Sequence, residues 1–495
     1  MGIIQKQAVK NTFYTYLGAV LGFLTSSFLF PHIFSTDQNG LRIVITSLAL
    51  LFAQFANLGF SNVTIRFFSH FRSKENKHHG FLFYPVIISV IGFSLWLILF
   101  LIFKSNIVAM NSEKSKLLAD YILYLIPFVF SLVFFNVLDA YARAVYSSVV
   151  GIFLKELLQR VLIIISALLY FFSVINFKGM VIGYIISFAI PTVVLALYLI
   201  RSGEWSLKPD TSKLNKSLAS DMIRMGLFSI LSGVASVTIA EIASIMVNQK
   251  LGLSAAGIYG ILAGFGLIIA LPSRALYRIS STVIADAWQK NDVKTIKSIY
   301  RKSCITQLLI GSFLFLGLWC NIDSVLSLLP PEYAVGKYII FFIGLGNLVE
   351  MATGVNGIII ANSKYYKYDA FFMVALIGIT IITNLIFIPI YGIIGSAIAS
   401  AVTITTFNLA RYLFLFFKFG MQPYDMQSLK VLLVSIVVFV LTGFIPYFDN
   451  FFVDTILHSI LIVIAFWILI VKMHVSEEIY ARLKVYLNLV GIKIP

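Results

Sequence analysis

Two acidic residues stand inside long apolar stretches, where a charge is costly. Glu350 lies near the middle of residues 336–361, and Glu241 lies within residues 220–249. A charged side chain at the bilayer centre costs about 2.5–3.5 kcal/mol on insertion scales, so such residues usually face protein or water. Either carboxyl is a candidate for binding a coupling proton or a cation such as sodium. The alternative is a protonated or paired carboxyl with a structural role.

Three arginines at the ends of apolar stretches suit the binding of an anion such as phosphate. Arg274 and Arg278 are one helical turn apart after Pro272, and Arg66 lies at the related end of an earlier stretch. Like charges at this spacing repel, whereas a bound anion would reverse the sign of the interaction. The guanidinium group also matches phosphate geometry. The alternative is that these side chains extend to the lipid headgroups of the inner leaflet.

Polar residues recur at helical spacing in two of the apolar stretches. Gln54, Asn57 and Ser61 share one face of the first, and Asn347 and Glu350 share one face of the second. Such faces can line a wet cavity that offers hydrogen bonds to a polar ligand. The alternative is that polar residues hydrogen-bond between helices that pack closely.

Two pairs of opposite charges flank a short turn between apolar stretches. Asp139 precedes Arg143, and Glu156 precedes Arg160, each by four residues with the acid first. That order favours an ion pair on a helix. We expect both ion pairs, as structural pairs or as part of a cytoplasmic gate.

These residues belong to fourteen apolar stretches that run almost end to end through the 495 residues. The chain is 60% hydrophobic and 12% charged, with a mean hydropathy of +0.95. About 20 apolar residues span the bilayer as a helix, and the stretches lack the period-two alternation of barrel strands. The predicted spans are 12–34, 41–66, 80–103, 119–143, 149–173, 178–201, 220–249, 255–279, 302–321, 336–361, 369–389, 391–417, 428–446 and 453–473.

The basic residues set the orientation. With both termini cytoplasmic, most of the 37 Lys and Arg fall on the cytoplasmic side, as the positive-inside rule requires. The net charge of +16 then faces anionic membrane lipids, and no nucleic acid is needed to explain it. The sequence shows no metal-ligand spacing, phosphate-binding loop or nucleophile motif, so we expect neither an enzyme nor a metal or cofactor site.

The sequence also repeats itself. Residues 175–187 (INFKGMVIGYIIS) resemble residues 388–400 (IPIYGIIGSAIAS), and two further matches share the offset of about 213 residues. We therefore predict an all-α polytopic membrane protein with two six-helix bundles related by a pseudo-twofold axis along the membrane normal. The predicted parts are an N-terminal half (1–205), a C-terminal half (206–420), two additional spans (421–473) and a cytoplasmic amphipathic tail (474–495).

Several segments resemble a known family. Residues 384–400 (NLIFIPIYGIIGSAIAS), 251–265 (LGLSAAGIYGILAGF) and 328–336 (LLPPEYAVG) are similar, in order and spacing, to segments of polysaccharide exporters. Those exporters belong to the multidrug/oligosaccharidyl-lipid/polysaccharide (MOP) superfamily. In the last segment, Pro331 stands where the family usually has Gly. The resemblance implies two bundles around a central cavity that opens alternately to each side, and an undecaprenyl-diphosphate-linked oligosaccharide as substrate.

We therefore expect a flippase of the bacterial cytoplasmic (inner) membrane, which carries a surface-polysaccharide repeat unit, such as that of O-antigen lipopolysaccharide, to the outer leaflet. In this hypothesis Arg66, Arg274 and Arg278 bind the diphosphate and the polar faces solvate the sugar. The flippase hypothesis also includes coupling to a proton or sodium gradient and contact with other polysaccharide-assembly membrane proteins. The alternatives are a cation-coupled multidrug antiporter of the same superfamily and a membrane-embedded glycan polymerase.

Overall fold

The fold was analysed in a computed structural model of the chain, which describes residues 3–111, 113–446, 448 and 450–475. The predicted all-α fold is confirmed, because these residues form helices and no strand. Eleven helices in the described part are long and apolar enough to cross a membrane. Most of the predicted amphipathic tail (474–495) lies outside the described residues.

Three of the fourteen predicted spans are not among the eleven, and each has a structural reason. Residues 148–171 form one helical stretch of two α-helices joined by a π-helical turn, but it carries three charged residues, Lys155, Glu156 and Arg160. Helix α18 (Tyr366–Phe419) contains two predicted spans, and the positive φ of Gly392 (58°) interrupts it between them. Helix α19 (Met426–Thr442) is apolar but short. The exact number of spans stays a prediction.

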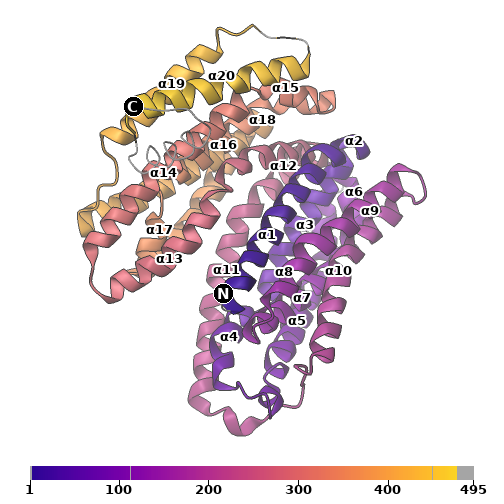
Figure 1. The fold of residues 1–495 in the computed structure, drawn as a ribbon. Coiled ribbons are helices and arrows are strands. Elements are labelled where there is room, and N and C mark those ends of the chain that lie inside the picture. Colours follow the sequence, from indigo (N-terminus) through magenta and orange to yellow (C-terminus); the bar gives the residue numbers. More distant parts are fainter. Residues whose placement is uncertain (1–2, 112, 447, 449, 476–495) are drawn as a thin grey trace. The chain divides into compact units, whose positions relative to one another are not determined.

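The chain divides into two compact units, residues 1–261 and 262–495, each described here by itself. Unit 1 contains α1 (Ile3–Leu24), α2 (Phe30–Ile33), α3 (Thr36–Ala56), α4 (Phe60–Phe67), α5 (Phe83–Asn111), α6 (Lys116–Tyr121), α7 (Leu125–Ala144), α8 (Ser148–Phe153), α9 (Gln159–Phe171), α10 (Phe177–Arg201) and α11 (Lys216–Leu251) (Figure 1). Helix α12 (Leu253–Leu267) crosses the boundary. Helix α11 packs along α3 within unit 1, and the predicted division of the chain at 205/206 stays a prediction.

Unit 2 contains the remaining helices: α13 (Ser273–Gln289), α14 (Val293–Trp319), α15 (Ile322–Ser327), α16 (Lys337–Ala352), α17 (Asn356–Ala361), α18, α19 and α20 (Phe451–Lys472). The two arms of α18 lie antiparallel. Ser396 donates a hydrogen bond to Asn384 at 2.7 Å, and Thr383 and Thr403 are 3.0 Å apart. These pairs fix the register of the hairpin.

Asp425 ties the first turn of α19 to α14. Its carboxylate accepts the backbone N–H groups of Gln427 and Ser428 and a hydrogen bond from Arg301 Nε at 2.7 Å. Burial raises the pKa of Asp425, but the Ser428 N–H and the Arg301 guanidinium outweigh that effect, so the pKa lies below its usual range.

We therefore expect the protein to lose stability as the pH falls from the ordinary carboxyl range through this lowered pKa. A lowered pKa in the folded state stabilises above the unfolded pKa and stops doing so once the carboxylate is protonated. Asp425→Asn, which keeps a capping oxygen, should flatten this part of the profile. Thermal unfolding of the unchanged protein and of Asp425→Asn, in detergent at a series of acidic pH values, measures this difference. If stability depends on pH identically in both proteins, the role of Asp425 is contradicted.

Candidate substrate-binding site

Two predicted spans are broken at related positions. In unit 1, α3 ends at Ala56, Leu58 and Gly59 have φ of 51° and 73°, and α4 begins at Phe60. In unit 2, α12 gives way to a 3-10 turn, and α13 begins at Ser273, 213 residues after Phe60. This is the offset of the sequence repeat. Interrupted helices at corresponding positions of two repeats are a strong pointer to the binding site of a transporter.

The polar face of the first broken span surrounds the break. Asn57 is 3% exposed, and its side-chain oxygen accepts hydrogen bonds from the backbone N–H and the hydroxyl of Ser61. Its amide nitrogen has no partner among the described residues. Half-buried Gln54 lies against α11, where a Cβ on Gly233 would come 1.8 Å from its amide nitrogen. The structure thus brings Asn57 and Ser61 together, whereas Gln54 packs between α3 and α11.

The arginines follow the two breaks. Arg66 is exposed near the end of α4, with its guanidinium 5.9 Å from the Phe67 ring centre. Arg274 and Arg278 are both exposed on the first turns of α13. Within the described part of the chain, none of the three forms an ion pair with a carboxylate. They are therefore cations available to an anionic ligand.

Glu241 bridges two helices of unit 1. Its carboxylate accepts a hydrogen bond from the Ser47 hydroxyl on α3 at 2.6 Å. Just after the end of α3, a Cβ on Gly59 would lie 2.3 Å from the carbonyl oxygen of Gly226 on α11. Helices α3 and α11 are thus closely packed. The hydrogen bond from Ser47 agrees with a structural role for Glu241.

In unit 2, Asn347 and Glu350 on α16 have different surroundings. Asn347 is 4% exposed and donates to the carbonyls of Ile343 (2.9 Å) and Gly266 (3.3 Å), which ties α16 to α12. Half-buried Glu350 lies within electrostatic range of the Arg411 guanidinium from the second arm of α18. Asn347 therefore contributes to packing, and Glu350 belongs to a charged cluster.

Arg411 is the centre of that cluster. It donates to Asp369 from both Nε (3.0 Å) and Nη2 (2.6 Å), with side-chain exposures of 14% and 18%. The Phe407 ring lies 4.0 Å from the guanidinium carbon. Arg411 thus forms an ion pair with Asp369, and its charge also acts on Glu350.

Amide side chains extend the cluster. Asn408 accepts hydrogen bonds through its side-chain oxygen from Thr353 (2.9 Å) and Asn356 (3.1 Å). None of these residues, nor Asp369 and Arg411, was predicted from sequence. The signal that could have found them is that Asp369 and Arg411 lie inside predicted spans, and that Asn408 and Arg411 share one helix face.

Both predicted ion pairs of unit 1 are formed. Arg143 Nε is 3.0 Å from Asp139, and Arg160 Nη2 is 3.2 Å from Glu156, which lies in the π-helical turn between α8 and α9. The second pair packs against two glycines of α1, Gly18 and Gly22. A Cβ on Gly18 would lie 2.8 Å from the Glu156 carbonyl oxygen, and one on Gly22 would lie 1.8 Å from Arg160 Nη1. Whether the pairs act as a gate stays a prediction.

The two glycines should differ in their tolerance of a side chain. Gly18→Val is expected to lower the free energy of unfolding by about 1–3 kcal/mol, because the Glu156 backbone cannot shift without distorting the helix. Gly22→Ala should cost less, because only the end of the flexible Arg160 side chain must move. Thermal unfolding of both purified variants measures the difference. Equal losses would show that the glycine contacts do not set this packing.

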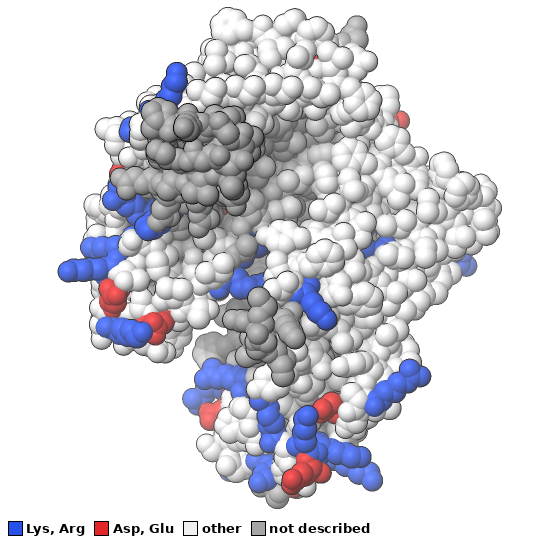
Figure 2. All heavy atoms as spheres, in the orientation of Figure 1, with Lys and Arg blue, Asp and Glu red and all other residues white. Residues whose placement is uncertain are grey.

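Charged residues are sparse over most of the surface. Figure 2 shows a face that is largely without Lys, Arg, Asp or Glu, on which the charged side chains gather in patches. Many large apolar side chains are exposed along the spans, such as Leu99 (55%) and Ile98 (56%). An apolar exterior of this extent suits a lipid environment. In the described residues, no group of three or more His, Cys, Asp or Glu could hold a metal ion.

Solved structures share this architecture. A lipid II flippase, MurJ, in an inward closed conformation, aligns over 94% of this chain and 98% of its own, with 16% identity and a TM-score of 0.74. An inward-facing multidrug resistance MATE transporter of the MOP superfamily aligns over 82% and 93%, with 14% identity and a TM-score of 0.61. A variant of the Vibrio cholerae MATE transporter VcmN aligns over 83% and 97%, with 13% identity and a TM-score of 0.54.

No family model and no curated protein matches the chain. The chain therefore shares the fold of these solved structures, one of which is described as a transporter of the MOP superfamily. At the level of fold, this likeness agrees with the resemblance predicted from the sequence. The neighbours named above are described as a flippase and transporters.

Proposed function

We propose that this protein is a flippase that moves an oligosaccharide linked to undecaprenyl diphosphate from the cytoplasmic to the outer leaflet of the bacterial cytoplasmic membrane. The two halves would rock around a central cavity and open it alternately to each side. The fold supports this proposal, because a structural neighbour over nearly the whole chain is described as a lipid II flippase. Lipid II is the substrate of that neighbour, and the surface-glycan precursor is our proposal for this chain.

The observation that carries the proposal is the exposed arginine pair that follows the second helix break. Arg274 and Arg278 lie one turn apart, and neither has a carboxylate partner among the described residues. Two adjacent guanidinium groups match the oxygens of a diphosphate. In the proposal Arg66, which follows the first break, also binds the diphosphate. The polar face of Asn57 and Ser61 then accepts the sugar.

The charged cluster around Glu350 is the proposed coupling element. Glu350 and Asp369 share the cation Arg411, so protonation of Glu350, or its pairing with sodium, would alter how Arg411 is held. A change in ion pairing is a local event that can bias a two-state element. Glu241, which is held by Ser47, is the second candidate.

A cation-coupled multidrug antiporter is the second candidate function. Half-buried carboxylates in each unit, Glu241 and Glu350, favour it, as does the likeness to MATE transporters. Such a protein would bind organic cations, which the exposed arginines disfavour. We therefore rank it second.

In either case the proposed setting is the inner membrane, with cytoplasmic termini, anionic lipids around the basic loops and, for the flippase, other polysaccharide-assembly proteins as neighbours.

The proposal can be tested in cells from which this chain has been deleted. We expect the lipid-linked oligosaccharide to accumulate at the inner leaflet and the surface glycan to disappear, both restored by the unchanged protein. Drug susceptibility of the same cells is the control for the antiporter. Normal surface glycan together with increased drug sensitivity would reject the flippase and favour the second candidate.

A further inference from the structure

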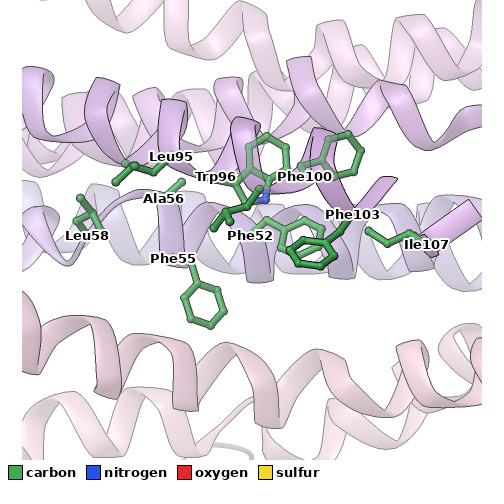
Figure 3. Close-up of a pocket in the computed structure, with 11 residues that line it drawn as sticks. Phe52, Phe55, Ala56, Leu58, Leu95, Trp96, Phe100, Phe103 and Ile107 are labelled. Carbon is green, nitrogen blue, oxygen red and sulfur yellow. The ribbon is translucent and has the colours of Figure 1, made fainter. Parts of the chain in front are cut away.

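An apolar groove runs between α3 and α5 in unit 1. It encloses about 390 Å³, and its walls are aromatic and aliphatic side chains, among them Phe52, Trp96 and Phe103. Figure 3 shows the rings of Phe52, Trp96 and Phe100 lying together between the two helices. The centres of the Phe52 and Trp96 rings are 5.6 Å apart, and those of the Trp96 and Phe100 rings are 5.2 Å apart. The groove is therefore a shaped surface and not a gap between smooth helices.

The groove is long enough for a lipid tail. Its lining on α5 extends from Gly92 to Ile107, which corresponds to ~22 Å along the helix at 1.5 Å per residue. The hydrocarbon core of a bilayer is about 30 Å thick. Leu95 and Leu99 on this wall are 54% and 55% exposed, so a ligand can reach them. Both walls belong to candidate membrane spans, Thr36–Ala56 and Lys77–Ala109.

One end of the groove meets the helix break of the first broken span. Gly92 lies against the Ala56 carbonyl, since a Cβ there would be 2.1 Å from that oxygen. Ala56 and Leu58, which line the groove, flank Asn57, whose buried amide nitrogen has no partner among the described residues. The apolar groove thus ends beside an unsatisfied hydrogen-bond donor, directly after the candidate span Thr36–Ala56 and within the predicted span 41–66.

This junction determines the occupant. An ordinary phospholipid keeps its polar head at the membrane surface, so its chains have no polar group at the depth of Asn57. A lipid whose head travels through the protein carries its polar part to that depth and needs an apolar exit for its tail. The geometry points to the α3–α5 groove as the binding site for the isoprenoid tail of the lipid-linked substrate. This inference rests on the proposed function and adds where the tail is held.

Photocrosslinking tests the site on the full chain in vesicles. A benzophenone amino acid replaces Leu99, which lines the groove, and in a matched protein it replaces the neighbouring Ile98, which does not. The two positions are equally exposed, at 55% and 56%. The probes are radiolabelled undecaprenyl diphosphate and radiolabelled phosphatidylglycerol. We expect position 99 to label the undecaprenyl probe preferentially, and position 98 to label the two probes in proportion to their abundance.

A second variant pair measures the consequence for transport. Leu99→Trp fills the groove and should lower transport of the lipid-linked oligosaccharide roughly tenfold, the factor that corresponds to about 1.4 kcal/mol of lost binding. Ile98→Trp is the control and should leave transport unchanged. Both variants should unfold at the temperature of the unchanged protein.

The outcomes separate this inference from the proposed function. If the unchanged protein transports the oligosaccharide but position 99 labels both probes equally, or Leu99→Trp transports normally, the tail site is wrong and the flippase stands. If position 99 prefers the undecaprenyl probe but the unchanged protein transports nothing, the tail site stands and the proposed function is wrong.

Discussion

Replacing both Arg274 and Arg278 by alanine is expected to abolish surface glycan while the protein remains in the membrane in normal amount. The two side chains are exposed on α13, so their removal should not disturb the core of unit 2. Each charge-assisted hydrogen bond to phosphate contributes about 1.5–3 kcal/mol, so losing two should reduce transport by ~100-fold or more. Quantitative immunoblotting of membranes and staining of the surface glycan measure the two quantities.

Two further variants show whether the effect belongs to these positions. Lys294 and Lys297 are also exposed basic residues, at the start of α14, and their double replacement by alanine should leave the glycan normal. Arg274→Lys with Arg278→Lys keeps the charge but loses the bidentate geometry, so intermediate transport is expected. Normal glycan in the double alanine variant would disprove the diphosphate role.

Replacing Arg411 by alanine is expected to be the most destabilising single change in unit 2. It would leave the half-buried Asp369 without its cation, and the cost should approach about 3–5 kcal/mol, which is what breaking a fully buried pair from one side takes. It would also remove the cation shared with Glu350. Thermal unfolding in detergent should show a large fall in the midpoint, and the variant should reach the membrane in reduced amount.

The double variant Arg411→Gln with Asp369→Asn is the control for this interpretation. Two neutral partners leave no unpaired charge, so stability should recover in part. Glu350→Gln should leave stability nearly normal and reduce transport if the carboxyl takes part in coupling. An Arg411→Ala protein as stable as the unchanged one would show that the Asp369 pair does not hold the α18 hairpin together.

Composition and periodicity predicted the fold because the bilayer restricts it. A chain with so many apolar stretches of about 20 residues must form helices that satisfy their own backbone groups. A boundary was predicted between the spans 369–389 and 391–417, and the helical backbone of α18 is interrupted nearby, at Gly392. The same pattern could not show that the helix breaks at Asn57 to Gly59, between α3 and α4. The break requires a positive φ at Leu58, which leucine rarely adopts.

The site was predicted where it depends on local spacing. Pairs four residues apart, such as Glu156 and Arg160, share a helix face in any packing, and they form ion pairs. Asp369 and Arg411 are 42 positions apart, and they meet only through the register of the α18 hairpin. The α3–α5 groove depends likewise on how two spans pack, which single-chain periodicity does not specify. Long-range contacts of this kind are the part that the sequence alone could not supply.

The central claim, that this chain flips a lipid-linked oligosaccharide, is tested most directly with purified protein in liposomes. An undecaprenyl-diphosphate oligosaccharide is placed in both leaflets, and a glycan-oxidising enzyme outside the liposomes modifies every sugar that it can reach. The unchanged protein should make the inner pool accessible within the assay, and the Arg274→Ala, Arg278→Ala variant should leave it protected as in empty liposomes. An inner pool that stays protected with the unchanged protein would contradict the claim.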